Sequence, residues 1–288
     1  MSVRKAVMPV AGFGTRVLPA TKAVPKEMLP VVDRPAIQYV VDEALEAGIE
    51  HIVFVTGRNK GAIEDYFDHA YELEASLAAK NKHEILKSVE ASRLKQGAAS
   101  FVRQQEPLGL GHAIWCARDI IGNEPFAILL PDVIVKAERS CLAQMVDAYN
   151  QTGGNVIAVD PIAMERVSSY GVIAPKGERD GKITEMSGMV EKPAIADAPS
   201  NLKITGRYIL QPEIFGLLED QGAGAGGEIQ LTDAMARLME RQSFFAVEFD
   251  GKDYDCGSKI GYFEAVLAHA LDHPEIGAEA RAMIKAAL

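Results

Sequence analysis

The sequence predicts an α/β fold built on a Rossmann-like, mostly parallel sheet that is flanked by helices. Strand-like and helix-like segments alternate along the first half of the chain, which is typical of a parallel sheet covered on both faces. The first apolar run, at 6–10, leads directly into a loop with closely spaced glycines, which fits the first strand of an α/β domain. With 288 residues, of which 48% are hydrophobic, the chain can bury a sizeable core.

The elements of the first half follow from hydrophobic periodicity. Apolar residues between 37 and 45 recur at helical spacing, and Gly48 is the expected stop. The predicted strands lie at 6–10, 51–56, 100–104, 126–130 and 155–159, and the predicted helical segments lie at about 60–93, at 109–121 and from about 141.

The pattern changes from Tyr170 onwards. Short β-like runs predict an antiparallel, β-rich extension of the sheet that carries the site of a second substrate. These runs lie at 171–174, 182–190 and 203–210, and helices at 213–218 and 231–241, a strand at 244–249 and a helical end from about 259 follow. The glycine-rich run at 222–227 is expected to be a flexible surface loop, with a lid hinge as the alternative. We expect a single domain over 1–288.

Charge and cysteine content exclude several classes of protein. The formal net charge is −10, which disfavours a general nucleic-acid binder. No apolar stretch reaches transmembrane length and the amino terminus lacks a signal-peptide pattern, so we expect a cytoplasmic protein without membrane association. The three cysteines are widely separated and fit neither a disulfide framework nor zinc-ligand spacing, so they are expected to be reduced.

The loop at 12–27, GFGTRVLPATKAVPKE, indicates an anion site. Two glycines let backbone N–H groups approach a ligand, and Arg16, Lys22 and Lys26 add three cations before the first acidic residue. This combination suits a polyanion such as a triphosphate, while a flexible turn with solvated charges is the alternative. A Rossmann fingerprint is excluded because position 17 is Val17, and no Walker A run occurs in the chain.

With these two motifs excluded, the loop at 12–27 resembles the signature of sugar-phosphate nucleotidyltransferases. The run PKEMLPVVDRPAIQYVVDEA at 25–44 is similar to the bacterial uridylyltransferases of this superfamily, and the similarity covers nearly the whole chain. The resemblance implies transfer of a uridylyl group from UTP to α-D-glucose 1-phosphate, Mg²⁺ as cofactor, and a homo-oligomer. It also implies a nucleotide-binding part at about 1–160, a sugar-phosphate-binding part at about 161–258 and carboxy-terminal helices at about 259–288.

The resemblance assigns roles within the loop. Arg16 and Lys26 are implied to be catalytic, because they stabilise the triphosphate and the leaving group. Lys26 is expected to face solvent and to contribute little to stability. Glu27 is expected either to position the loop or to meet the nucleotide. The remaining nucleotide contacts implied here are Ala11, Gly12, Gly14 and Thr15.

Two aspartates are candidate metal ligands. Asp132 follows the apolar run FAILLP, which places a carboxylate at the carboxyl edge of the sheet, where Mg²⁺ finds the hard ligand that it prefers. A turn or helix cap is the ordinary reading of such an aspartate, but the cationic loop and the resemblance favour binding of nucleotide and metal. Asp255, in YDCGSK, is the second candidate. The alternative interpretation of Asp255 is a solvated acid in a turn ahead of a helix that Ser258 caps.

A loop at 104–113 is the candidate base site. Gln104 carries both a donor and an acceptor and is able to pair with the imide edge of uracil. The resemblance places Gln104 and Gly109 on the base, whereas without it a glycine-rich loop that starts a helix is the simpler interpretation. His112 is expected to be structural.

The sugar phosphate is assigned to later strands. Glu191 and Lys192 are neighbours on a strand and point to opposite faces, unless a bend before Pro193 brings both to one ligand. The resemblance makes Glu191 the glucose contact and Lys192 the phosphate contact, and adds Gly171 and Gly206 as sugar contacts.

Two other functions stay open at the level of sequence. One is the same fold with another nucleotide and sugar 1-phosphate, because base choice depends on a few hydrogen bonds. The other is a non-catalytic sensor of sugar nucleotides. No HxH, HExxH or GxSxG motif suggests a different chemistry.

Overall fold

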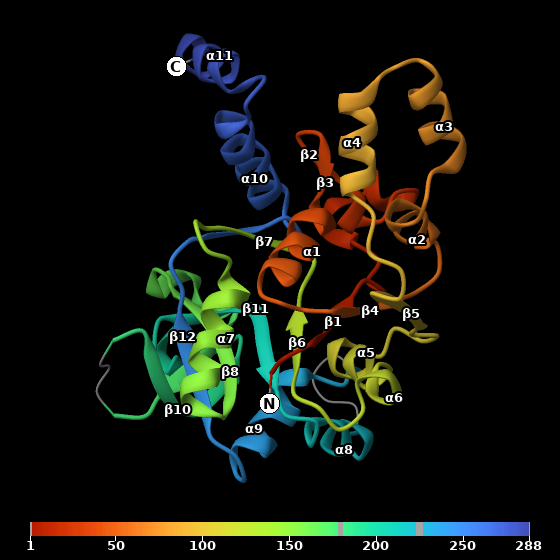
Figure 1. Cartoon of the computed structure of the whole chain (residues 1–288). Coiled ribbons are helices and arrows are strands. Elements are labelled where there is room, and N and C mark those ends of the chain that lie inside the picture. Colours follow the sequence, from red (N-terminus) through yellow and green to blue (C-terminus); the bar gives the residue numbers. More distant parts are fainter. Residues whose placement is uncertain (1, 178–180, 223–226, 288) are drawn as a thin grey trace.

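A nine-stranded sheet forms the centre of the molecule (Figure 1). The computed structural model describes residues 2–177, 181–222 and 227–287. The strand order of the sheet is β5-β4-β1-β6-β11-β8-β12-β10-β9. These strands are β1 (Lys5–Pro9), β4 (His51–Thr56), β5 (Ala99–Arg103), β6 (Phe126–Leu129), β8 (Asn155–Pro161), β9 (Gly171–Pro175), β10 (Ile183–Glu191), β11 (Leu202–Leu210) and β12 (Phe244–Glu248). Two small two-stranded sheets pair β2 (Pro30–Val31) with β3 (Arg34–Pro35), and β7 (Val133–Lys136) with β13 (Lys252–Asp255).

The predicted α/β sheet is confirmed. Strands β5, β4, β1 and β6 are parallel neighbours, and the pairing directions show that only β11 and β10 run against the other seven strands of this sheet. The carboxyl ends of β1, β5 and β6 therefore meet at one edge, which is where open α/β sheets bind ligands.

Helices cover both faces of the sheet. They are α1 (Ala36–Glu46), α2 (Gly61–Phe67), α3 (Tyr71–Ala79), α4 (His83–Ala91), α5 (Leu110–Trp115), α6 (Arg118–Ile121), α7 (Cys141–Thr152), α8 (Ile214–Glu219), α9 (Leu231–Met239), α10 (Lys259–Asp272) and α11 (Gly277–Ala287). Apolar residues of α5, α6, α8 and α9 pack in one core and those of α1, α2 and α7 in the other. Alternate residues of a strand serve the two cores, as Val7 and Met8 do in β1.

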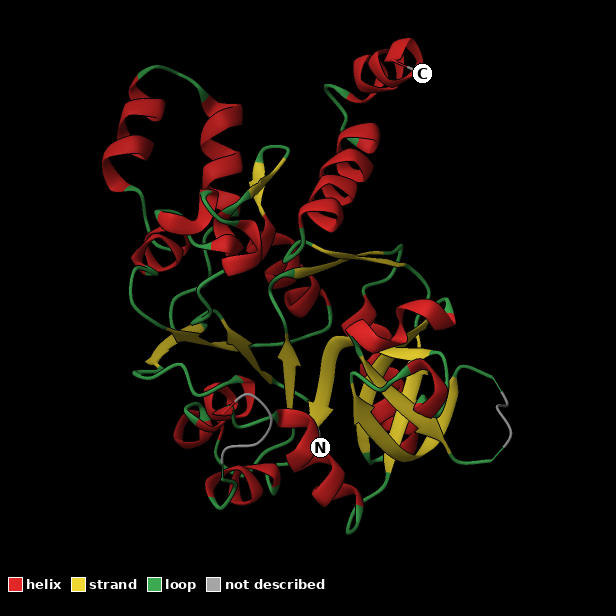
Figure 2. Cartoon of the chain, turned by 180° about the vertical axis from the view of Figure 1, so that it is seen from behind, coloured by secondary structure: helices red, strands yellow, loops and turns green. Residues whose placement is uncertain are grey.

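Two predicted helical segments are divided in the structure. The stretch at 60–93 forms α2, α3 and α4, since Asp68 is extended and Asn81 has a φ of 54° between α3 and α4. Helices α3 and α4 bury few side chains and project from the body (Figures 1 and 2). The stretch at 109–121 is divided into α5 and α6.

A third, smaller core lies beside the β7–β13 ribbon. Ile134, Tyr254 and Cys256 pack there with Ala265 of α10. Helices α10 and α11 project from the same end of the molecule as α3 and α4 (Figures 1 and 2). Across the described ranges, no helix combines the length and the hydropathy needed to cross a membrane. The glycine-rich run at 222–227 lies mostly outside the described residues, which omit 223–226.

Candidate active site

The loop after β1 turns sharply at a glycine. Gly14 has a φ of 66°, and a Cβ there would lie 3.0 Å from Cβ of Lys26. The hydroxyl of Thr21 donates to the Gly14 carbonyl over 2.8 Å, which closes the loop on itself. The close approach of 14 to 26 explains why this position favours glycine. Lys22 is exposed, and the cavity described below does not include it.

The other two loop cations meet the two predicted metal-binding aspartates. Lys26 Nζ lies 2.6 Å from Oδ2 of Asp132. Arg16 lies between the two acids, with Nη2 at 3.6 Å from Asp132 Oδ2 and Nη1 at 3.3 Å from Asp255 Oδ2. These four residues, Arg16, Lys26, Asp132 and Asp255, are called the charged cluster below.

Strand pairing brings the two aspartates together across 123 positions of sequence. Asp255 is the last residue of β13 and lies opposite Val133, the first residue of β7, and Asp132 directly precedes Val133 in the chain. Gly257 lies between them, since a Cβ there would be 2.9 Å from a carboxylate oxygen of each aspartate and would clash with Arg16. The Asp255 carboxylate is partly buried and also accepts from the Gly257 N–H over 3.0 Å, in the turn ahead of α10. Ser258 caps α10 by accepting from the Gly261 N–H, as the alternative interpretation expects.

The charged cluster shifts the pKa of each buried member. Burial raises the pKa of Asp132, but the charge and hydrogen bond of Lys26, with the Arg16 charge, together outweigh burial and hold the pKa below its ordinary value. Burial lowers the pKa of Lys26, whereas Asp132 and Glu27 more than compensate and the net shift is upward. Burial and the nearby Asp132 charge raise the pKa of Asp255, against the opposing effect of Arg16. Lys26 and Asp132 are therefore both charged at neutral pH.

Lys26 is not the solvent-facing residue that we expected from the sequence. Its side chain is 17% exposed and that of Asp132 is 15% exposed. The Lys26 side chain lies against Gly12 and Gly14 of the same loop and against Asp132.

The neighbouring Glu27 is also buried, and Lys60 Nζ donates to its Oε2 over 2.7 Å. Burial raises the pKa of Glu27 and lowers that of Lys60. Glu27 is wholly buried and does not line the cavity, so of its two expected roles the geometry supports positioning the loop.

A cavity of about 350 Å³ opens at the carboxyl ends of β1, β5 and β6, a volume typical of small-molecule sites. It brings together seven of the predicted nucleotide and catalytic residues: Ala11, Gly12, Thr15, Lys26, Gln104, Gly109 and Asp132. Glu228, which sequence reasoning missed, also lines it. The Ile229 N–H donates to the Leu108 carbonyl and the Gly111 N–H to the Ile229 carbonyl, which holds Glu228 over the base loop.

A buried arginine, which sequence reasoning also missed, donates hydrogen bonds to the segment that carries Asp132. Arg207, in β11, is 0% exposed, and its Nη groups donate to the carbonyls of Leu130 (3.1 Å) and Val133 (2.7 Å). Its charge is balanced by Glu43 of α1 at 2.8 Å. The available signal was a charged residue directly before the apolar end of the strand, Arg207 ahead of Tyr208, Ile209 and Leu210.

The predicted sugar residues form a second group at the end of β10. Glu191 pairs with Gly171 in the β10–β9 register, and a Cβ on Gly171 would lie 3.0 Å from Oε2 of Glu191. Lys192 has a φ of 48°, and this bend brings its Nζ to 3.4 Å from Oε1 of Glu191. The two side chains thus lie on one side. Thr232 of α9 also donates to Glu191, over 3.3 Å.

The fourth sugar residue lies on β11. Gly206 has a φ of 74°, and a Cβ there would lie 2.9 Å from the side chain of Leu130, which lines the cavity. Burial and, to a lesser extent, Glu191 raise the pKa of the neighbouring strand residue Tyr208. Strand β11 therefore lies against both groups of predicted residues.

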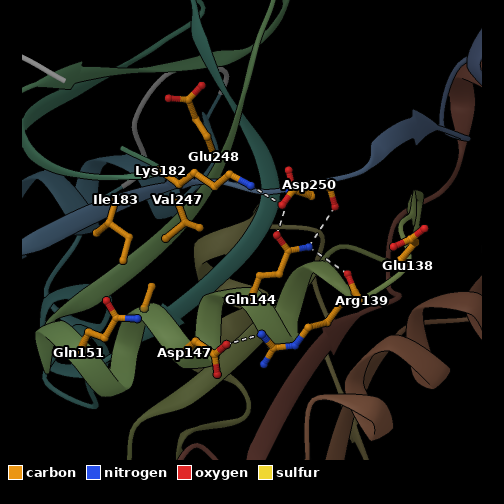
Figure 3. Close-up of a pocket in the computed structure, with 11 residues that line it drawn as sticks. Glu138, Arg139, Gln144, Asp147, Gln151, Lys182, Ile183, Val247, Glu248 and Asp250 are labelled. Atoms are coloured by element: carbon orange, nitrogen blue, oxygen red, sulfur yellow. Dashed lines mark hydrogen bonds and ion pairs between the residues drawn. The ribbon is translucent and has the colours of Figure 1, made fainter. Parts of the chain in front are cut away.

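A further hollow of about 330 Å³ lies on the face of α7 (Figure 3). Its cations are already paired, Arg139 with Asp147 and Lys182 with Asp250, while Gln144 bridges Arg139 and Asp250 through backbone hydrogen bonds. None of the predicted site residues lines it. The cavity at the sheet edge is therefore the candidate active site.

A sequence model of the nucleotidyl transferase family matches residues 5–270, and the chain belongs to this family. It is 52% identical over 275 residues to the UTP–glucose-1-phosphate uridylyltransferase of Bacillus subtilis, covering 95% of this chain and 93% of that protein. It is 53% identical over 258 residues to the enzyme of the same name from Komagataeibacter xylinus, covering 90% of each.

Solved structures give the same result. A UTP-bound UGPase from Acinetobacter baumannii superposes with a TM-score of 0.91 at 45% identity, over 98% of both chains. A UDP-glucose pyrophosphorylase complexed with UDP-glucose superposes with a TM-score of 0.83 at 44% identity, over 94% of this chain and 100% of that one. The family predicted from the sequence is confirmed.

Proposed function

We propose that this chain transfers a uridylyl group from UTP to α-D-glucose 1-phosphate, giving UDP-glucose and pyrophosphate. The observation that carries the proposal is the meeting of Lys26, Arg16 and the two aspartates beside a cavity that also holds Gln104. Relatives named for this reaction are about half identical over nearly the whole chain.

In this proposal the residues act by positioning and by neutralising charge, as in phosphoryl transfer generally. The phosphate oxygen of glucose 1-phosphate attacks the α-phosphorus of UTP in line, and pyrophosphate leaves. Lys26 and Arg16 stabilise the charge that develops on the triphosphate. Lys192 holds the attacking phosphate, and Glu191 accepts hydrogen bonds from sugar hydroxyls.

Asp132 and Asp255 are the proposed holders of Mg²⁺. Their carboxylates converge on the space that the missing side chain of Gly257 leaves open, and one or two carboxylates with substrate phosphates are a typical Mg²⁺ site. Within the described residues no cluster of three or more acidic, His or Cys ligands occurs, which fits a metal that completes its shell with substrate. The ion would neutralise triphosphate charge when bound.

The division of the chain is also a proposal. We assign nucleotide binding to about 1–160, sugar-phosphate binding to about 161–258 and the carboxy-terminal helices to about 259–288, all in one domain.

The three free cysteines support a reducing, cytoplasmic setting. The carboxy-terminal helices α10 and α11 expose the apolar side chains of Ile260, Phe263 and Met283, which supports a homo-oligomer that buries them. Light scattering of the wild type and of Phe263→Glu tests this oligomer.

The test is pyrophosphate release across a panel of nucleoside triphosphates and sugar 1-phosphates. UTP with glucose 1-phosphate is expected to give the highest kcat/KM. A different best pair would replace the substrates but keep the reaction, and no release with any pair would favour a sensor. Asp132→Asn is expected to raise the Mg²⁺ concentration for half-maximal activity, and an unchanged titration would remove Asp132 from the metal site.

A further inference from the structure

The amide of Gln104 is held on one side by two groups. Its Nε2 lies 3.0 Å from the carbonyl oxygen of Gly109 and 3.1 Å from Nδ1 of His112. A backbone carbonyl only accepts hydrogen bonds, so the amide atom that faces it must be the nitrogen. The Gly109 carbonyl and Nδ1 of His112 therefore orient the Gln104 amide together, and Nδ1 of His112 must be the acceptor in its own contact.

The surroundings of His112 favour the same tautomer. With Nδ1 accepting, the neutral ring carries its proton on Nε2, which lies 4.0 Å from Sγ of Cys116. The ring stacks on that of Trp115 at 5.8 Å between centroids. Burial lowers the pKa of His112 and Arg118 adds to this effect against Glu106, so the ring stays neutral at pH 7.

The orientation leaves one polar atom of Gln104 for a ligand. Oε1 accepts no hydrogen bond from any residue in the described part of the chain. It is not one of the fully buried atoms without a partner, so it remains accessible. Gln104 lines the cavity, and Oε1 is its accessible polar atom without a described partner, so Oε1 is available to a ligand as an acceptor. An acceptor at this point suits a base that donates from ring N3, as uracil does, and not cytosine, whose N3 is itself an acceptor.

We propose that His112 is a positioning residue for base selection, which holds the Gln104 amide so that Oε1 faces the cavity and the site selects an N3–H pyrimidine. This inference rests on the proposed function, because it refines how that site chooses UTP. His112 itself need not touch the base. Without its Nδ1, only the Gly109 carbonyl orders the amide, and the amide can turn its NH₂ toward the base.

The test uses a pair of variants that differ in the acceptor and match in shape. His112→Asn keeps a side-chain oxygen near the place of Nδ1, whereas His112→Leu has similar size and no acceptor. We expect His112→Leu to lower kcat/KM for UTP about tenfold, mostly through KM, and to reduce the UTP-over-CTP preference by a similar factor. His112→Asn is expected to stay within about threefold of wild type in both quantities.

A second acceptor-free variant guards against misfolding. His112→Phe keeps a flat ring against Trp115, and it is expected to behave like His112→Leu while its thermal unfolding matches wild type. Equal effects of the Asn, Leu and Phe variants, or an unchanged UTP-over-CTP ratio in the two acceptor-free variants, would overturn the inference. Absence of UTP turnover in wild type would instead overturn the proposed function, so the two failures are distinguishable.

Discussion

Arg207 and Glu43 form a buried ion pair, 2.8 Å between Nη2 and Oε2, that joins β11 to α1 beneath the turn that carries Asp132. The same guanidinium donates to the carbonyls of Leu130 and Val133, on either side of Pro131-Asp132. Glu43 in turn accepts from the Leu142 N–H at the start of α7. The pair thus links the active-site turn to two helices.

Breaking this pair from one side should be costly. We expect Arg207→Met to lower the free energy of unfolding by about 3–5 kcal/mol, because it leaves Glu43 buried without its partner. The double variant with Glu43→Leu should cost less than the sum of the single variants, which chemical denaturation measures. Additive effects would show that the two side chains are not coupled.

Lys26 should matter for both turnover and stability. Lys26→Met is expected to lower kcat about 10²–10³-fold, because it removes a fixed cation from the transition state. It should also lower the free energy of unfolding by about 1.5–3 kcal/mol, since the 15% exposed Asp132 loses a charged hydrogen bond. Lys22→Met, in the same loop but exposed, is the matched control and should change neither quantity. Near-normal turnover of Lys26→Met would contradict the assignment.

Variants at position 192 should separate the role of the Lys192 side chain from the cost of its backbone conformation. Its φ of 48° is unfavourable for a residue with a side chain, by about 1–2 kcal/mol. Lys192→Ala and Lys192→Gly should both raise KM for glucose 1-phosphate, because both remove the ammonium. The Gly variant should be about 1 kcal/mol more stable than the Ala variant. Equal melting temperatures would mean that the bend costs nothing.

The cysteines should be protected in the folded protein. Burial raises the pKa of Cys256 to about 12 from an ordinary 9.0, and it also raises the pKa of Cys116 and of Cys141. At pH 8 the thiolate of Cys256 should be about a thousandfold scarcer than in the unfolded chain, so a thiol reagent should label it only in guanidinium.

The same shifts set a direction for stability. The folded state holds these thiol protons more tightly than the unfolded chain does, so their contribution to stability is complete below pH 9.0 and falls as pH rises through the folded values. Melting temperatures measured from pH 8 to pH 11 should therefore decline. Labelling of Cys256 in the native protein at the unfolded rate would contradict both expectations.

The sequence was sufficient for features that depend on local pattern. Alternating buried runs predicted the strands of the large sheet, and the two glycines with Arg16 and Lys26 predicted an anion loop. Their meeting with Asp132 followed from the rule that parallel strands end at one edge. The burial of Lys26 did not follow, because no pattern in the loop shows that it folds back and sets Lys26 against Gly12 and Gly14.

The β7–β13 ribbon was beyond sequence reasoning for a related reason. Each strand has only four residues. The VIVK run of β7 is rich in β-branched residues, but KDYD in β13 has one aromatic residue among charged ones and no strand pattern. The ribbon forms through pairing across more than a hundred positions, and that pairing alone brings Asp255 to Asp132. Arg207 was missed because a charged side chain in a strand is normally assigned to the solvent face.

Gly257 makes the site intolerant of very small changes. Arg16, Asp132 and Asp255 come from three remote parts of the chain, and all three reach the point that a single methyl group at position 257 would fill. Alanine, the mildest substitution available, would push apart the groups that the whole fold assembles. We therefore expect Gly257→Ala to displace Arg16 from the two carboxylates and to lower kcat, while the melting temperature stays near that of wild type.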